Sequence, residues 1–174
     1  MDVRNCSKLE TLCCKPAPDA DGNTANIVEK TFDFANFPIF DRTKNTNCYL
    51  GLKNTNPVYI KNLTYIGNVS ELFLDCPSLW YFTNVFITST GTSANSCFRN
   101  CVKLRANDDE IDGGITFFNS DTVTNVSAAF AGCHNIGLDI PYRFALAHPQ
   151  ATNFNSYLSY AGNSSDAIGT WIWP

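Results

Sequence analysis

The chain repeats a short pattern around single cysteines, and this repeat limits its possible folds more than any other feature. The segments "NVSELFLDCPSL", "SANSCFRNCVKL" and "NVSAAFAGCHNI" align on Cys76, Cys101 and Cys133. In each segment a phenylalanine stands three residues before that cysteine, and an aliphatic residue stands three residues after it. One copy of this size cannot bury its own apolar side, so neighbouring copies are expected to pack together and share a core.

Two weaker copies extend the pattern. The segment "NFNSYLSYAGNS" keeps Asn153, has Leu158 at the phenylalanine position and has Ala161 at the cysteine position. Residues 3–9 keep the apolar spacing of three residues. We therefore expect a single domain, 1–174. Its expected parts are an N-terminal partial repeat at 1–14, an insertion or degenerate repeat (or a separate capping element) at 15–60, repeats at 61–165 and a C-terminal cap or tail at 166–174.

The spacing inside each copy indicates a helix, and the stretches between copies indicate strands. Apolar residues three and four apart are typical of one face of a short helix. Asparagine and serine upstream, as at Asn68 and Ser70, are natural helix caps. The expected strands lie within 8–14, 57–66, 79–87, 114–120 and 135–141. The sequence therefore predicts an α/β fold in which short helices and strands alternate.

The pattern N-V-S-x-x-F-x-x-C-x-x-L resembles the BspA-type leucine-rich repeat of bacterial, protist and viral surface proteins. The resemblance covers residues 66–165, with "NCSKLETL" as an additional fragment near the start. It implies an α/β leucine-rich-repeat solenoid of short helix–strand units with irregular inserted loops. It also implies a role in adhesion or partner binding. Two features depart from the family pattern: the spacing is longer than the usual unit, and residues 105–110 interrupt the strand expected after the second helix.

The cysteines of the repeat are expected to be buried, reduced thiols that stack in one row. Cys97 stands where other copies have leucine or alanine, which indicates a small apolar residue. Cys6 belongs to the same row as Cys76, Cys101 and Cys133. Outside the row stand Cys13, Cys14 and Cys48, and one of the first two could form a disulfide with Cys48. No C-x-x-C pair and only two histidines are present, so no zinc site is expected.

One stretch begins like a calcium-binding EF-hand loop and then departs from it. Asp19, Asp21 and Asn23 occupy the first ligand positions. Thr24 replaces the glycine required for the sharp turn, and Lys30 replaces the bidentate glutamate. A turn is therefore the preferred interpretation, and no metal ion or other cofactor is expected.

The remaining candidate chemistry does not assemble into a catalytic pattern. His134 stands at a variable repeat position that should be exposed, His148 precedes a proline in an expected loop, and residues 107–112 form an expected solvated acidic loop. No nucleophile, phosphate-binding or dinucleotide motif is present, so the protein is not expected to be an enzyme. A net charge of -4 without a lysine or arginine cluster argues against nucleic-acid binding. No apolar run approaches the roughly 20 residues that span a membrane.

The aromatic residues supply the candidate contact sites. The segment 31–40 is expected to contribute mainly to the core rather than to an interface. In the tail, Trp171 and Trp173 stand two residues apart and would form one ledge, either as a cap over the end of the fold or as a docking surface. Exposed aromatic rings are also expected at Trp80, Tyr81, Tyr142 and Tyr157. The candidate partner-contact residues are Trp80, Tyr142, Trp171 and Trp173.

Together these features predict a non-enzymatic structural or interaction protein. The preferred setting is the surface of a phage or virus particle, where the chain would mediate subunit or receptor contacts. The alternative is a domain of a secreted bacterial or protist cell-surface adhesin that binds a host protein or glycan. The short length and the lack of a signal peptide in "MDVRNCSKLE" favour the virion. The expected partners are subunits of the same assembly, with a homo-oligomer as one form, or a host surface protein or glycan.

Overall fold

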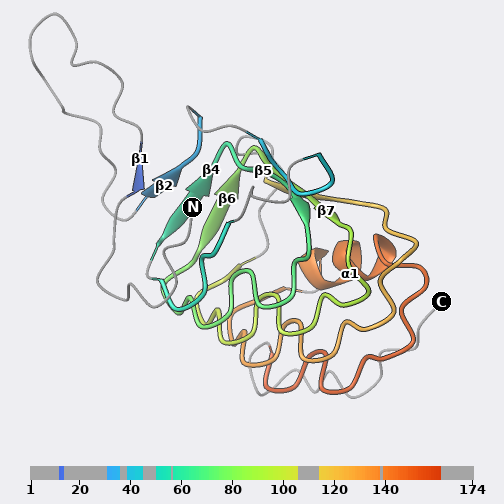
Figure 1. Cartoon of the computed structure of the whole chain (residues 1–174). Coiled ribbons are helices and arrows are strands. Elements are labelled where there is room, and N and C mark those ends of the chain that lie inside the picture. Colours follow the sequence, from blue (N-terminus) through green and yellow to red (C-terminus); the bar gives the residue numbers. More distant parts are fainter. Residues whose placement is uncertain are drawn as a thin grey trace, which may run out of the picture.

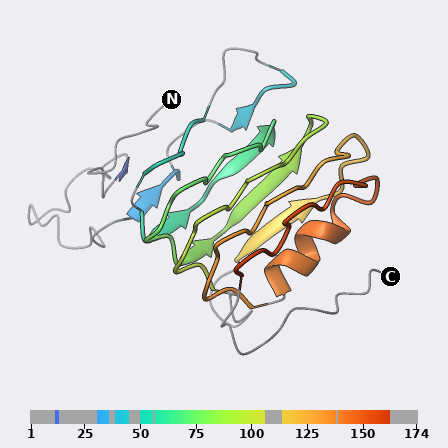
Figure 2. The same cartoon turned by 90° about the horizontal axis from the view of Figure 1, so that it is seen from below.

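A computed structural model of the chain describes residues 12–13, 31–35, 39–44, 50–55, 57–105, 114–137 and 139–161. Its strands form two parallel four-stranded sheets, and a short helix lies beside the second sheet (Figure 1 and Figure 2). The first sheet has the order β1-β2-β4-β6, with β1 at Leu12–Cys13, β2 at Thr31–Asp33, β4 at Tyr59–Lys61 and β6 at Tyr81–Thr83. The second has the order β3-β5-β7-β8, with β3 at Phe40–Asp41, β5 at Thr64–Gly67, β7 at Val85–Ser89 and β8 at Ile115–Phe118. The helix, α1, spans Asp139–Leu146.

A bend at an asparagine separates the strand that enters the first sheet from the strand that enters the second. Asn62 lies between β4 and β5 at φ 57°, and Asn84 lies between β6 and β7 at φ 52°. Asparagine tolerates this left-handed backbone better than most residues. The side chains also form a column, because Asn84 Nδ2 donates to Asn62 Oδ1 at 3.3 Å and Asn62 Nδ2 donates to Asp33 Oδ1 at 2.9 Å. The column keeps successive bends in register.

The sheets bury one face each, as the alternation of a strand requires. In the first sheet, Phe32, Ile60 and Phe82 are register partners, and their side chains are buried. In the second sheet, Tyr65 and Ile87 are register partners and are buried in the same way. The turns lie below the sheets in the view of Figure 1, and Phe82 of the first row meets Phe73 and Phe98 of these turns edge-on.

These turns form a ladder of five segments, which we call the turn ladder: 50–55, 69–76, 94–101, 126–133 and 154–161. Their backbone N–H groups alternate between two kinds of acceptor. Leu72 N donates within its own segment to Val69 O at 3.1 Å, whereas Phe73 N donates to Cys97 O of the next segment at 2.8 Å. Residues at positive φ recur at matching positions, as at Glu71 and Asp75 in the second segment. The repeat therefore corresponds to a stack of turns.

The predicted leucine-rich-repeat solenoid of helix–strand units is wrong. The part of the chain that the structure describes contains two parallel sheets and a single α-helix, and that helix lies outside the aligned repeat segments. A helix cannot form in those segments because residues such as Ser96 and Asn100 take positive φ, which an α-helix of L-residues excludes. The asparagines upstream do cap the turns, since Asn68 Oδ1 accepts Ser70 N at 2.9 Å and Asn125 Oδ1 accepts Ser127 N at 3.0 Å.

The expected strands are mostly confirmed, with one clear error. Strands occur at the predicted stretches 8–14, 57–66, 79–87 and 114–120, although β5 and β7 extend to Gly67 and Ser89 and the asparagine bend divides the second and third stretches. The stretch 135–141 is not a strand, because α1 begins at Asp139 within it. Pro141 in the first turn and an ion pair between Asp139 and Arg143 at 2.6 Å both favour the helix.

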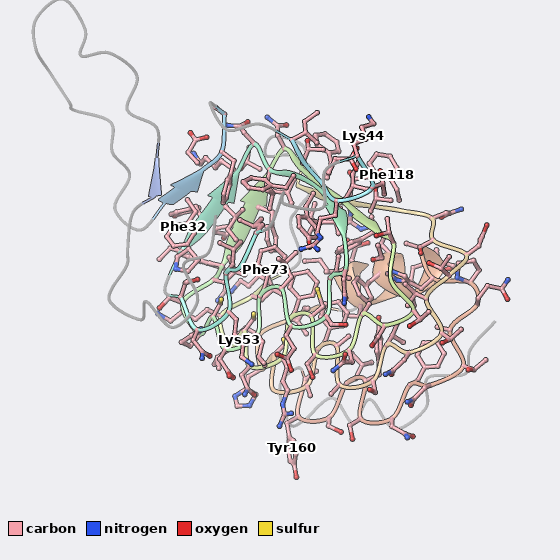
Figure 3. The ribbon with its side chains drawn as sticks, viewed as in Figure 1. Phe32, Lys44, Lys53, Phe73, Phe118 and Tyr160 are labelled. Atoms are coloured by element: carbon pink, nitrogen blue, oxygen red, sulfur yellow. The ribbon has the colours of Figure 1, made fainter. Side chains whose placement is uncertain are left out.

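A column of phenylalanine rings forms the centre of the core. Phe73 stacks on Phe98 with ring centroids 5.0 Å apart, and Phe98 stacks on Phe130 with centroids 5.1 Å apart. These are the three phenylalanines of the sequence repeat. Phe82 from β6 and Phe144 from α1 meet Phe98 edge-on. Figure 3 shows Phe73 between the sheets and the turn ladder. Within the aromatic segment 31–40, the expectation of a core role is confirmed for Phe32, Phe34 and Phe40, whereas Ile39 is 60% exposed.

The left-handed positions of the fourth turn segment provide a test of the ladder. Gly132 has φ 75°, and a Cβ there would lie 2.4 Å from Asn100 Oδ1, whereas Ala128 has φ 52° and already carries a Cβ. We expect Gly132→Ala to lower the free energy of unfolding by about 1–3 kcal/mol. We expect Ala128→Gly to leave it unchanged or raised by up to about 1 kcal/mol, because glycine relieves the left-handed strain. Urea unfolding of both variants measures the difference, and equal stabilities would contradict the ladder geometry.

Candidate interaction surfaces

The outer face of the first sheet carries a column of stacked aromatic rings with a cation at each end. Tyr59 stacks on its register partner Tyr81 with centroids 5.9 Å apart, and Tyr81 stacks on Trp80 with centroids 4.5 Å apart. The Lys61 ammonium lies 6.0 Å from the Tyr59 ring, and the Arg105 guanidinium lies 5.4 Å from the Trp80 ring. All three rings are half-buried.

The stacked rings of this column face one another and so present mainly their edges to solvent. The column is thus stabilised within the molecule by stacking and cation–π attraction. Trp80 Nε1 is buried and has no hydrogen-bond acceptor among the residues that the structure describes. The contacts with Tyr81 and Arg105 therefore hold the Trp80 ring in the fold, and only the remaining exposed part of the ring is available to a partner.

A second set of exposed apolar side chains lies on β7, β8 and α1. Phe86 and Phe118 point outward from neighbouring strands, stack with centroids 6.3 Å apart and are 37% and 50% exposed. On α1, Tyr142 and Leu146 are one helical turn apart and are 45% and 50% exposed. The helix is fixed against β8 by Arg143 Nη1, which donates to Ile115 O at 2.9 Å. We call Phe86, Phe118, Tyr142 and Leu146 the apolar face.

A third surface is the last segment of the turn ladder, 154–161. Its carbonyl groups accept hydrogen bonds from the preceding segment, as Tyr157 O does from Phe130 N at 3.0 Å. Tyr160 is 85% exposed and points away from the body of the molecule in Figure 3. This segment therefore forms the end of the ladder as far as the structure describes it.

A small cavity of about 80 Å³ lies where the first two turn segments meet the second sheet. Its lining includes Lys53 and Glu71, which form an ion pair of 2.7 Å, and the half-buried Ser70. Leu52 and Leu72 add apolar walls. A cavity of this size has room for ordered water molecules between the ion pair and the apolar walls.

Four cysteines in the described repeats are buried free thiols, as the sequence predicts: Cys76, Cys97, Cys101 and Cys133. Cys101 Sγ donates to Phe73 O at 3.1 Å, and Cys133 Sγ donates to Phe98 O at 3.0 Å, so each thiol satisfies a carbonyl of the preceding turn segment. Cys76 makes the equivalent bond to Leu52 O, beside the hydroxyl of Thr55. Thr55 thus occupies the cysteine position of a degenerate copy at 50–55 that the sequence alignment missed. Cys6 and the side chains of Cys13, Cys14 and Cys48 lie outside the described part of the chain.

Burial makes these thiols unreactive. It raises the pKa of Cys76 to about 11 and that of Cys133 to about 12, and it raises the pKa values of Cys97 and Cys101 well above the usual range. At pH 8 about one Cys76 thiol in a thousand would be ionised, so alkylation of all four in the native protein should be slow and limited by unfolding. Mass spectrometry after maleimide labelling checks this, with the denatured chain as the control. Labelling of these cysteines within minutes under native conditions would contradict the structure.

A buried serine–histidine pair connects the loop after α1 to β7, and no sequence pattern indicated this pair. His148 Nδ1 donates to Phe144 O at 2.6 Å, and His148 Nε2 accepts a hydrogen bond from Ser89 Oγ at 2.8 Å. The carbonyl acceptor fixes the tautomer, since a carbonyl oxygen can only accept. Both side chains are buried, with exposures of 2% for His148 and 4% for Ser89. His148 lies in the loop that follows α1, as expected from Pro149, but its side chain is buried, and the pair is a structural contact.

The structure separates the predicted partner-contact residues. Trp80 is half-buried beside the first sheet, whereas Tyr142 is exposed on α1. Trp171 and Trp173 lie outside the described residues, as do 19–30 and 107–112. Tyr157 is buried and donates to Pro141 O at 2.8 Å, so its predicted exposure is wrong. His134 is exposed, as expected.

Within the described ranges, no three histidine, cysteine, aspartate or glutamate side chains come together as a metal site. Over the same ranges, no helix is long and apolar enough to cross a bilayer. No protein-family model, no curated protein and no solved structure shows significant similarity to the chain.

Proposed function

We propose that this chain is a non-enzymatic structural protein that acts through contacts between its surface and other protein subunits. The apolar face carries the proposal. Phe86 and Phe118 expose aromatic rings on the second sheet, and Tyr142 and Leu146 expose apolar groups on the helix beside it. Exposed aromatic side chains that stack together, as Phe86 and Phe118 do, are typical of protein contact sites, because their burial in a complex releases water from apolar surface.

The placement of the reactive groups supports a contact role over catalysis. The thiols of Cys97 and Cys101 and the pair of Ser89 and His148 are buried in the core, where their hydrogen-bonding capacity serves the fold. A nucleophile needs access to its substrate as well as a base. The hydrogen bonds of these groups lie inside the core and stabilise the fold.

The setting that we propose is the surface of a virion, with subunits of the same assembly as partners. This setting comes from the resemblance of the repeated sequence pattern to surface-protein repeats. The alternative setting, a cell-surface adhesin domain that binds a host protein or glycan, shares the contact role and differs in its partner.

Light scattering of the purified chain over a concentration series tests the proposal. We expect mass above 19.2 kDa at high concentration, and we expect the double variant Phe86→Ser, Phe118→Ser to weaken that association at least tenfold. Ile39→Ser is the matched control, because Ile39 is 60% exposed but precedes β3, on the opposite edge of the same sheet.

A chain that stays monomeric and binds a host protein or glycan through the apolar face would support the adhesin setting. A monomer that binds nothing on protein and glycan arrays, or an association that the double variant leaves unchanged, would overturn the role of the apolar face.

A further inference from the structure

The backbone hydrogen bonds between the turn segments all point in one direction. Each of the first four segments donates backbone N–H groups to carbonyls of the segment that follows it in the sequence, and no backbone N–H group of one aligned turn segment donates to a carbonyl of the segment before it. The donor–acceptor pairs are Asn54–Leu74, Glu71–Asn95, Phe73–Cys97, Asp75–Arg99, Ser96–Ser127, Phe98–Ala129, Asn100–Ala131, Ala128–Asn155, Phe130–Tyr157 and Gly132–Ser159. The ladder therefore has a donor side toward its C-terminal end and an acceptor side toward its N-terminal end.

The donor side of the last segment is open among the described residues. Residues Ser156, Leu158 and Tyr160 stand at the positions of Ala128, Phe130 and Gly132 in the segment before. Their N–H groups donate to no described residue. Ser156 and Tyr160 take φ 57° and 58°, the same left-handed conformation as Ala128 and Gly132. The backbone thus holds three donors in the geometry that binds a further turn segment.

Because the open groups are all hydrogen-bond donors, only a partner that presents acceptors can bind them. Two copies of the chain cannot join through this side symmetrically, because N–H groups would then face N–H groups. The structure shows repeatedly what covers such a row of donors: a turn segment of the same repeat that presents its carbonyls. A turn segment of a second copy that presented its carbonyls in this way would fit the three N–H groups.

We propose that a second copy of this chain stacks head-to-tail on the segment 154–161, with its acceptor side on the N–H groups of Ser156, Leu158 and Tyr160. The inference rests on the proposed structural role and names the partner and the contact. A head-to-tail contact uses two different surfaces, so repetition gives a ring or an open filament rather than a closed dimer. The exposed ring of Tyr160 becomes buried at the joint.

Amide hydrogen exchange at two protein concentrations tests this contact directly. In the dilute monomer the amides of Ser156, Leu158 and Tyr160 should exchange rapidly, and in the associated form they should become at least tenfold slower. The amides of Ala128 and Phe130 are the internal control, because they are bonded within the chain and should be slow in both states. Protection of the three amides already in the monomer, for example by residues 162–174 of the same chain, would overturn the proposal.

A proline variant gives a second measurement. Leu158→Pro removes one of the open N–H groups and places a ring on the contact surface, so association should weaken at least tenfold. Leu158→Ala is the matched control, since it shortens the side chain but keeps the donor, and its association should stay within threefold of the original. If the proline variant does not fold, the exchange experiment on the unmodified chain still decides the question.

The outcomes separate this contact from the broader proposal. Association that leaves the three amides unprotected, or that Leu158→Pro does not weaken, overturns head-to-tail stacking and leaves a structural role through the apolar face intact. A monomer that binds another protein or a glycan also overturns the stacking while keeping the contact role. A chain that neither associates nor binds overturns both.

Discussion

Replacing Phe98 by alanine should lower the free energy of unfolding by about 3–5 kcal/mol, the largest effect expected of any single truncation in this chain. Phe98 is fully buried in the middle of the phenylalanine column, between Phe73 and Phe130. Phe82 and Phe144 also meet its ring edge-on, so alanine leaves a cavity bordered by both sheet and helix. Close-packed surroundings relax only partly into such a cavity, which adds to the lost burial of the ring.

Denaturant unfolding, followed by intrinsic fluorescence and circular dichroism, measures this loss. Phe118→Ala is the matched control because Phe118 is 50% exposed, and it should cost less than about 1 kcal/mol. A loss below about 1.5 kcal/mol for Phe98→Ala would mean that the ring column does not form the centre of the core.

The second large effect is the loss of stability when His148 is replaced, and the same histidine also makes the stability depend on pH. His148→Leu removes the partners of Ser89 Oγ and Phe144 O, and leaving these buried groups unpaired should cost about 2–4 kcal/mol. Ser89→Ala added to His148→Leu should recover part of the loss, since no hydroxyl is then buried without a partner. A double variant that is less stable than the sum of the single changes would contradict the pairing.

The pH dependence of stability follows from the burial of the same histidine. Burial lowers the pKa of His148 below 6.5, and the hydrogen bond to Phe144 O opposes this only in part. At pH above 6.5 both the folded and the unfolded chain hold a neutral imidazole, so the full stability is present. As the pH falls below 6.5, the unfolded chain binds a proton that the folded chain excludes. The free energy of unfolding therefore decreases with falling pH until the pH lies below the pKa of His148 in the folded chain.

This slope reaches at most about 1.4 kcal/mol per pH unit for one proton. Unfolding curves of the original chain and of His148→Leu at several pH values between 7 and 5 measure it. The variant should lack the slope, while a variant of the exposed His134 should keep it. An identical slope in the original chain and in His148→Leu would assign the acid sensitivity to other groups.

The core positions were predictable from the repeat, but the conformation of the repeat was not. Phe73, Phe98 and Phe130 align in the sequence and stack in the structure, because equivalent positions of successive copies lie one above the other. A spacing of three residues suits a helix and also suits a turn that bonds back over three residues. Positive φ at Ser96 and Ala128 rules out the helix, and neither residue type signals that conformation.

Two features that the sequence analysis did not predict, the helix α1 and the degenerate repeat at 50–55, do have a recognisable sequence pattern. Pro141 after an acidic residue, with Arg143 four residues beyond Asp139, is a start signal for the helix that the strand prediction overlooked. Thr55 could have been aligned with Cys76 as a small residue of similar size. The pair of Ser89 and His148 had no such signal, because 59 residues separate the two side chains and only the tertiary structure places the loop after α1 beside the end of β7.

The sequence alone therefore determined which residues are buried in the repeat, that its cysteines are thiols in the core, and where most strands lie. Burial follows from a periodic apolar pattern, which is a property of neighbouring residues. Tertiary structure alone decided that the repeats form turns, that the chain bends at Asn62 and Asn84 into two sheets, and that the ladder donates toward one end. These features depend on hydrogen bonds between residues 20 or more positions apart, as from Asn54 N to Leu74 O, and such bonds have no local sequence pattern.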